Sequence, residues 1–383
     1  MIDFSLTEEQ IALQNMAREF AVKEMRPRAA EYDKGEKFHW DFIEKAFEVG
    51  FVTCGIPEEY NGGALSHMDT IIISEELAWG CAGMYTSVMA SSLAFTPVIV
   101  FGTDEQKKTF LQPFTEKPSL AAFCLTEREA GSDAGALATR AEKVGDEYVI
   151  NGSKCFITNG GVASMYVVFA KTDPDKGVRG MSAFIVPRET PGITIGKEED
   201  KMGHRASNTC ELYFEDVRIP ASNLLAKEGM GFVVAMKTLD KTRAPVGAGG
   251  VGIARAALEY AIEYAKTRVQ FGKPIALFQD ISFKIAQMAA EISAARFLVW
   301  NAAWRLDNDL PVGKESAIAK FYASDIGMSA SNTALEILGG YGYMKDYPME
   351  KLMRDAKLLQ IYEGTNSIQR MVVGREVIGP IKT

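Results

Sequence analysis

Residues 145–161 read GDEYVINGSKCFITNGG, and this stretch decides the fold class of the chain. Its short runs rich in β-branched residues are divided by turn dipeptides such as Gly145-Asp146 and Asn151-Gly152. Similar runs follow at 166–169 and 183–186, with further turn signals between them. Short strands at this spacing predict a small antiparallel β-barrel or sandwich.

The residues on both sides of this region have helical periodicity. Before about residue 120, apolar side chains recur at helical spacing, and Thr7 with Gln10 forms the pattern of a capping box. After about residue 231, segments rich in Ala, Leu, Met and Lys run through 254–267, 283–306 and 316–338. The sequence therefore predicts an α+β protein in which a β-domain separates two helical regions.

Composition excludes several classes of function. The 383 residues carry a net charge of -8, which argues against a nucleic-acid partner. Five scattered cysteines without a CxxC motif indicate reduced, buried thiols, and three histidines without ligand spacing predict no metal site. No GxGxxG motif follows a strand, so a dinucleotide-binding Rossmann site is not supported.

The first ten residues, MIDFSLTEEQ, are acidic and lack an apolar core, so they do not form a signal peptide. A start at Met without an Arg-rich leader favours a bacterial cytoplasmic protein. No apolar stretch is judged long enough to cross a membrane, and we expect no membrane insertion.

A carboxylate near the C-terminus is the first candidate for chemistry. Glu363 stands between an aromatic residue and a glycine in the run 361–366, IYEGTN. Loss of water raises the pKa of a glutamate toward the range in which it can act as a base. Gly364 would let a ligand approach the main chain closely. An exposed loop glutamate is the alternative explanation of these six residues.

Two clusters in the predicted β-domain could bind a ligand. The polar loop 123–133 offers the hydroxyls of Thr126 and Ser132 and backbone N–H groups to an anion or a heteroaromatic edge, unless it is a surface turn. Phe156 and Thr158, two residues apart on a strand, would share one face, where a flat ring could lie. Ordinary hairpin packing would explain the second cluster equally well.

Two more clusters lie in the helical region. Arg268 begins the run 268–274, which ends in Gly-Lys-Pro. A guanidinium in this setting suits a phosphate. An ordinary helix C-cap would have the same sequence. The glycines of 336–343 allow close approach to a ligand or form a tight interhelical turn.

The order in which these runs occur together resembles the acyl-CoA dehydrogenases, over essentially the whole chain from Leu6 to Ile378 and closest to the medium-chain and short-chain type. The matching runs are 125–127, 130–133, 157–161, 240–243, 270–273, 352–357 and the Glu363 loop. The resemblance implies an N-terminal α-helical domain over 1–120, a central antiparallel β-domain over 121–230 and a C-terminal four-helix bundle over 231–383. It also implies a homotetramer that binds FAD across a subunit interface and passes electrons to an electron-transferring flavoprotein.

The resemblance assigns residues to the cofactor. Thr126 would meet the pyrimidine edge of the flavin and Ser132 its pyrophosphate, while Phe156 would stack on the ring and Thr158 would reach N5. Arg268, Phe271 and Gln279 would hold the ADP portion of a neighbouring subunit's FAD. The full implied set is Phe123, Leu125, Thr126, Gly131, Ser132, Phe156, Ile157, Thr158, Arg268, Phe271, Phe278, Gln279, Glu336, Gly339, Gly340, Gly364, Thr365 and Asn366.

The resemblance also implies the mechanism. Glu363 would remove the proton α to the thioester carbonyl, and the β-hydride would pass to flavin N5 to give the 2-enoyl-CoA. In a family variant the base lies instead at the position of Thr242, which has no carboxylate here. The implied substrate contacts are Ser132, Tyr85, Met89, Asp240, Arg243, Tyr362 and Arg375.

Two residues depart from the family pattern, and one segment bears on the substrate. Glu336 stands where Gln is usual, and its charge would repel pyrophosphate unless it were protonated or turned to a donor. Arg128 replaces a usual Pro, and its charge could compensate that of Glu336. Tyr85 and Met89 are bulky, which favours a short, branched or cyclic acyl group, and Met84 stands where a carboxylate-binding Arg would select a dicarboxylic one. The alternatives are an acyl-CoA oxidase that uses oxygen, and a non-catalytic relative.

Overall fold

The computed structural model describes residues 4–35 and 38–380, so the first three and last three residues of the predicted outer domains lie outside it. The N-terminal part is helical, and three of its helices begin at side-chain caps. At α1 (Glu8–Phe20) the Thr7 hydroxyl accepts from Gln10 N, and the Gln10 side chain accepts from Thr7 N, which confirms the predicted capping box. The same arrangement starts α4 (His67–Gly80) and α6 (Asp104–Phe110). The other α-helices here are α2 (Ala29–Tyr32), α3 (Trp40–Glu48), α5 (Ala82–Phe101) and α7 (Pro113–Glu116).

The central region is one sheet with the strand order β6-β7-β3-β2-β4-β5-β8, to which β1 adds by pairing with β4. Most pairs are antiparallel, as predicted, but β1–β4 is parallel and β2 meets β4 in parallel at Arg140 and Lys171. The sheet is therefore mixed. Its strands are β1 (Ala121–Cys124), β2 (Arg140–Val144), β3 (Glu147–Thr158), β4 (Met165–Lys171), β5 (Met181–Pro187), β6 (Ile193–Glu198), β7 (Thr209–Pro220) and β8 (Leu224–Leu225).

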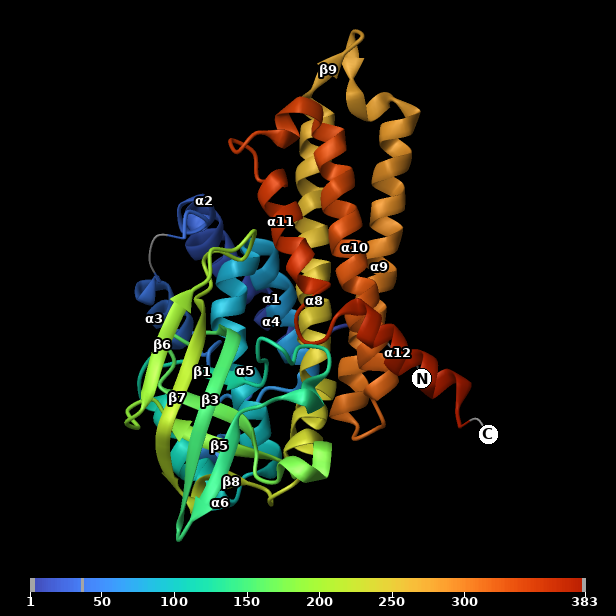
Figure 1. Ribbon diagram of the computed structural model, residues 1–383. Coiled ribbons are helices and arrows are strands. Elements are labelled where there is room, and N and C mark those ends of the chain that lie inside the picture. The colour runs from blue at the N-terminus through green and yellow to red at the C-terminus, as the bar shows by residue number, and fades with distance from the viewer. Residues whose placement is uncertain (1–3, 36–37, 381–383) are drawn as a thin grey trace.

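The C-terminal region is a bundle of long helices (Figure 1). Helices α8 and α10 pack closely at Gly250. A Cβ at this position would lie only 2.5 Å from the Ala323 carbonyl oxygen, so the close approach requires a glycine. A short hairpin of β9 (Val269–Gln270) and β10 (Lys273–Pro274) tops the bundle, far from the sheet in Figure 1. The helices are α8 (Gly231–Thr267), α9 (Gln279–Asp307), α10 (Gly313–Leu338), α11 (Met349–Leu359) and α12 (Asn366–Ile378). The exact boundaries of three domains stay a prediction.

Helix α5 corrects one expectation from the sequence. By length and composition it could cross a membrane, so the expectation that no apolar stretch was long enough is wrong. Most of the helix is buried, and its residues Tyr85, Val88 and Met89 belong to the main hydrophobic core. A core helix accounts for this apolar run. All five cysteines are buried and free, which confirms the prediction of buried thiols.

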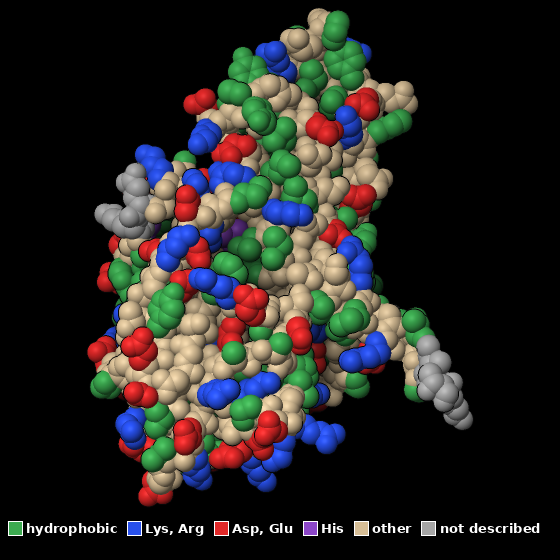
Figure 2. All heavy atoms as spheres, in the orientation of Figure 1, with side chains coloured by type: hydrophobic (Ala, Val, Ile, Leu, Met, Phe, Trp, Pro, Cys, Tyr) green, Lys and Arg blue, Asp and Glu red, His purple; other side chains and the backbone are tan. Residues whose placement is uncertain are grey.

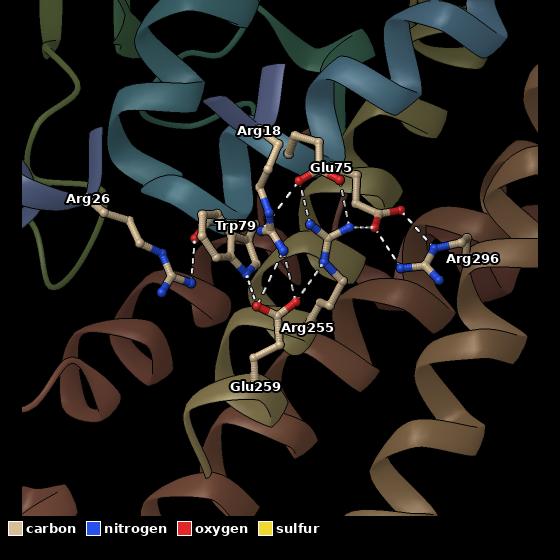
Figure 3. Close-up of polar contacts among 8 residues, drawn as sticks. Arg18, Arg26, Glu75, Trp79, Arg255, Glu259 and Arg296 are labelled. Carbon is tan, nitrogen blue, oxygen red and sulfur yellow. Dashed lines mark hydrogen bonds and ion pairs between the residues drawn. The ribbon is translucent and has the colours of Figure 1, made fainter. Parts of the chain in front are cut away.

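A network of charged residues, buried at Glu75 and Glu76 and partly exposed at Arg18 and Glu259, joins α1 and α4 to α8 and α9 (Figure 3). Arg255 contacts Glu75 and Glu76, with its Nη2 2.5 Å from Glu76 Oε2, and Arg296 pairs with Glu75 at 2.7 Å. Arg18 pairs with Glu259 at 3.1 Å, and its guanidinium lies 3.3 Å from the centre of the Trp79 ring. We define this charge cluster as Arg18, Glu75, Glu76, Arg255, Glu259 and Arg296. Its ions are closely paired, as buried charges require.

Candidate active site

The loop between α11 and α12 presents Glu363 in an unusual backbone conformation. Glu363 has φ +51° and Gly364 has φ +91°, and the first of these is costly for a residue with a Cβ. The loop is tied down from two sides. Gln369 Nε2 donates to the carbonyl oxygens of Glu363 at 3.1 Å and Gly364 at 3.0 Å, and Lys320 Nζ donates to that of Gly364 at 2.8 Å. These hydrogen bonds hold a strained residue in one orientation.

The carboxylate of Glu363 meets α8. Thr242 Oγ1 donates to Glu363 Oε2 at 2.7 Å. Thr242 is the position at which the sequence raised an alternative base, so the two candidate positions lie side by side in the fold. The only carboxylate of the two is held by the hydroxyl of the other, which leaves Glu363 as the group able to accept a proton.

Burial raises the pKa of the Glu363 carboxyl to about 7, although Thr242, Lys320 and Arg243 act in the opposite direction. Burial also lowers the pKa of the Lys320 ammonium to about 7, against the attraction of Glu363. Arg243 is buried and pairs with Asp240 at 2.7 Å. A base with a pKa near 7 is ionised for a useful fraction of time yet binds a proton readily.

Two polar atoms near the base have no hydrogen-bond partner in the described part of the chain. They are Arg243 Nε and Gln369 Oε1, both buried. The backbone N–H of Glu363 likewise has no acceptor within residues 4–35 and 38–380. Buried polar groups are normally satisfied, so the place beside Glu363 suits a polar ligand.

Two tyrosines flank the base. The Tyr85 hydroxyl donates to the Pro245 carbonyl oxygen at 2.8 Å, and a Cβ on Gly249 would lie 3.1 Å from the Tyr85 ring. Burial raises the pKa of both Tyr85 and Tyr362, and the charge of Glu363 adds to each shift. Thr242, Pro245 and Gly249 follow one another along one face of α8. Tyr85 therefore meets α8 about one helical turn, roughly 5 Å along the axis, past Thr242.

A buried ion pair holds the loop that follows β1. Lys154, fully buried on β3, contacts Glu127 Oε1 at 2.7 Å and the Leu125 carbonyl oxygen at 3.1 Å. The Glu127 carboxylate also accepts the N–H groups of Ala138 and Thr139. This pair fixes the shape of the polar loop before any ligand binds.

The same loop lies against the end of β3, so two of the predicted clusters come together. Cys155 N donates to the Thr126 carbonyl oxygen at 3.0 Å. Phe156 has φ +56° at a bulge in β3 and is 65% exposed, while Thr158 is half-buried and Ile157 between them is buried. Phe156 and Thr158 are thus both accessible, but a bulge that the sequence did not indicate interrupts the regular alternation on which their shared face was predicted.

Some predicted cofactor residues are engaged elsewhere. Leu125 and Ile157 are buried in the core, and the Phe123 ring packs on Phe169 at 4.8 Å, so these three side chains are occupied by core packing. Asn366 is 6% exposed and binds Lys320, Ser324 and Asp325 of α10, which turns its amide away from a ligand. Thr365 caps α12 by accepting from Ile368 N.

Five of the predicted cofactor residues, Arg268, Phe271, Phe278, Gly339 and Gly340, line a site at the far end of the bundle, beside the β9–β10 hairpin. A cavity of about 610 Å³ opens there, and Arg268 lies 5.5 Å from the Tyr341 ring at its wall. A Cβ on Gly339 or Gly340 would meet nothing within 4 Å, so both glycines face open space. The cavity is lined by Tyr264, Arg268, Gln270, Phe271, Ile275, Phe278, Ile281, Ile337, Leu338, Gly339, Gly340, Tyr341 and Met344.

Arg128 and Glu336, the two departures from the family pattern, have different partners in the structure. Arg128 pairs with Glu211 at 3.0 Å in the β-region, so within the chain it does not compensate Glu336. Glu336 instead accepts from Asn332 at 3.0 Å and has the Lys284 ammonium 3.9 Å away. Gln279 is exposed at the start of α9. Whether Arg128 offsets the charge of Glu336 was left open by the sequence, and within the described chain the partner of Arg128 is Glu211.

The predicted substrate residues lie in three places. Tyr85, Met89, Asp240, Arg243 and Tyr362 lie on elements that meet at Glu363, and Ser132 is exposed on the loop after β1.

Arg375 is apart from them, exposed on α12 and about 13 Å along the helix axis from its first residue. Lys320, Gln369, Lys154 and Glu127 were missed. One signal was available: Lys320 falls in the same helical register as the buried Ser316, Ala323 and Gly327.

Comparisons with known proteins show the family of the chain. Three family profiles match the chain, described as the acyl-CoA dehydrogenase N-terminal domain over residues 7–117, middle domain over 122–217 and C-terminal domain over 229–378. The acyl-CoA dehydrogenase of Bacillus subtilis is 46% identical over 376 residues, covering 98% of this chain and 99% of that protein.

Two solved structures are similar over nearly their whole length. Butyryl-CoA dehydrogenase from Megasphaera elsdenii superposes with a TM-score of 0.96 at 46% identity, covering 99% of this chain and 100% of that one. A chain in a structure named "Electron transferring flavoprotein of Acidaminococcus fermentans" superposes with a TM-score of 0.97 at 47% identity, covering 99% and 100%.

Proposed function

Because the chain belongs to the acyl-CoA dehydrogenase family, we propose that it desaturates a short or compact acyl-CoA thioester, with Glu363 as the base. One observation carries the proposal. The only carboxylate at the two possible base positions is held by Thr242 at 2.7 Å, with its pKa raised by burial to about 7.

The chain is a FAD flavoprotein, as the family is. When bound, FAD supplies the acceptor for the β-hydride. Thr126, Ser132, Phe156 and Thr158 would hold the flavin end, where a ring could lie against the exposed Phe156. The loop fixed by the Lys154–Glu127 pair supports this role, because its main chain is held in one shape beside Phe156.

The protein's own groups divide the proton-transfer step among them. The ionised Glu363 carboxylate takes the α-proton while Thr242 keeps it oriented. The unpaired Glu363 N–H would donate to the thioester oxygen, where negative charge develops. Arg243, with a free Nε and its partner Asp240, would contact the CoA portion. Tyr85 and Tyr362 exclude water from the carboxylate.

The acyl group is proposed to be short, branched or cyclic. Support comes from Tyr85, whose hydroxyl is tied to Pro245 one helical turn past Thr242. The apolar Met84, 1% exposed, offers no partner for a second carboxylate and so disfavours a dicarboxylic group.

A second copy of the chain is proposed to complete each cofactor site, in a homotetramer. The four residues proposed above to hold the flavin ring lie in the β-region. The residues proposed for the ADP portion lie far from them, at the end of the bundle beside the β9–β10 hairpin (Figure 1): Arg268, Phe271, Phe278, Gly339 and Gly340. Phe271 is 94% exposed, and hydrophobic side chains gather over this end of the molecule (Figure 2). Separation of the two halves supports a site shared between subunits, which size-exclusion chromatography with light scattering tests.

An electron-transferring flavoprotein is the proposed electron acceptor, and the bacterial cytoplasm the proposed location. The similarity to the Acidaminococcus fermentans structure supports the first. An oxidase is the alternative, and consumption of oxygen at the rate of thioester oxidation would establish it instead.

The function is tested by anaerobic titration of the purified protein with butyryl, hexanoyl, octanoyl, isobutyryl, cyclohexanecarboxyl and glutaryl thioesters. Bleaching of the flavin absorbance by one or two compact thioesters is expected. A bound flavin that no thioester reduces would refute the proposed activity.

A further inference from the structure

The buried ammonium of Lys320 has no place in the function proposed above. Lys320 lies on α10, is fully buried, and forms no ion pair within 4 Å among residues 4–35 and 38–380. Its Nζ donates to two neutral acceptors, the Gly364 carbonyl oxygen at 2.8 Å and Asn366 Oδ1 at 3.0 Å. A buried, unpaired cation is expensive, and such groups concentrate at functional sites.

The two acceptors identify what Lys320 acts on. Gly364 follows Glu363 directly in the loop, and Asn366 is the first residue of α12, where that loop ends. Lys320 therefore reaches the base through the backbone, without a direct contact to the carboxylate. Its charge still faces Glu363 within the buried site, because each group favours the charged form of the other.

We propose that Lys320 is a positioning residue for Glu363: it anchors the loop in its strained conformation, and its positive charge favours the ionised carboxylate. This inference rests on the proposed function of Glu363. It differs from the role of Gln369, which ties the same loop through an uncharged amide.

Other groups around Glu363 could contribute to its ionisation and are included in the argument. Thr242 and Arg243 face it from α8, and Arg243 is largely matched by Asp240. Asp325 lies near Lys320 and favours its charged form, but is itself bound by Arg370 and Gln360. The neutral Tyr85 comes from α5, and Tyr362 precedes the base. Lys320 is thus the charge in this set without a carboxylate paired to it at short range.

The test compares Lys320→Met with Gln369→Leu in flavin-containing holoenzyme. Both changes remove loop hydrogen bonds and should slow flavin reduction by butyryl-CoA. Only Lys320→Met removes a charge, so only there should the acid limb of the second-order reduction rate move to higher pH, by about one unit. Exchange of the thioester α-hydrogen with deuterated water, followed by NMR, should show the same displacement without depending on hydride transfer.

The proposal would be overturned if the reduction rate of Lys320→Met fell at the same acidic pH as that of wild type. It would also be overturned if the pH of this fall moved equally far in Gln369→Leu. If the Met variant does not fold, Lys320→Gln serves, since its amide can still donate to the Gly364 oxygen without the charge. A wild-type flavin that no thioester bleaches refutes the proposed function instead, so the two failures are distinguishable.

Discussion

The charge cluster and the Glu363 loop both bury ionic groups, but they arrange them in opposite ways. In the charge cluster every carboxylate touches a guanidinium, and the contacts of Glu76 and Glu75 outweigh burial and raise the pKa of Arg255. At the loop, Glu363 and Lys320 are held by neutral groups, and burial moves both pKa values to about 7. Paired charges fasten helices together, whereas separated ones remain able to gain and lose protons.

The largest expected effect is that of Glu363→Gln, which removes the proton acceptor but keeps the shape of the loop. The rate of flavin bleaching by butyryl-CoA should fall about 10²- to 10⁴-fold, the usual contribution of a general base. Flavin content, read from the absorbance spectrum, should equal that of wild type. Normal turnover in this variant would show that another group takes the proton.

Arg255→Met tests the other half of the comparison. It leaves Glu75 and Glu76 buried with fewer partners, and loss of one member of a buried ion network costs about 3–5 kcal/mol. Urea denaturation should show that loss in the free energy of unfolding. The pH at which flavin reduction reaches half its plateau should not move. Glu259→Gln is the matched control, because Glu259 is 40% exposed and should cost far less.

Thr242→Val removes the hydroxyl that donates to Glu363 without changing the shape of the side chain. A hydrogen bond to a charged group contributes about 1.5 kcal/mol or more, so the pKa of Glu363 should rise by about one unit. Below pH 6 the reduction rate should then be roughly tenfold lower than in wild type, with recovery at pH 9. A rate lowered equally at all pH values would mean that Thr242 does not act on the ionisation of Glu363.

The smallest effect expected is on substrate choice. Tyr85→Ala should raise the ratio of octanoyl to butyryl kcat/KM by about tenfold or less, because it opens space beyond the base. Tyr85→Phe, which loses only the hydrogen bond to Pro245, should keep the wild-type ratio. An unchanged ratio in the Ala variant would place the end of the acyl pocket elsewhere.

Local sequence patterns predicted much of the fold. The capping box at Thr7 and the strands around 145–161 depend on neighbouring residues, so they could be read from the chain. The parallel pairing of β1 with β4 could not, because alternation identifies a strand but not its partner. The apolar run of α5 was underestimated, since helix composition alone does not separate a core helix from a membrane span.

The site was predicted in parts rather than as an arrangement. Glu363 and Thr242 were singled out separately, 121 residues apart, and only the packing of α8 against the loop joins them. Lys320 was overlooked because a lysine in a helix is usually on a solvated face. The small residues on its own face, such as Ala323 and Gly327, were the available sign that this side chain points inward.

The pH dependence of flavin reduction in the wild-type enzyme tests the central claim most directly. The measured quantity is the second-order rate constant with butyryl-CoA between pH 5 and 9, which reports the free enzyme. Glu363 must be ionised to accept a proton, so the rate should rise as pH increases through about 7 and level off above it. A rate independent of pH down to 5 would contradict the account, because Glu363 would then have the pKa of an ordinary exposed glutamate.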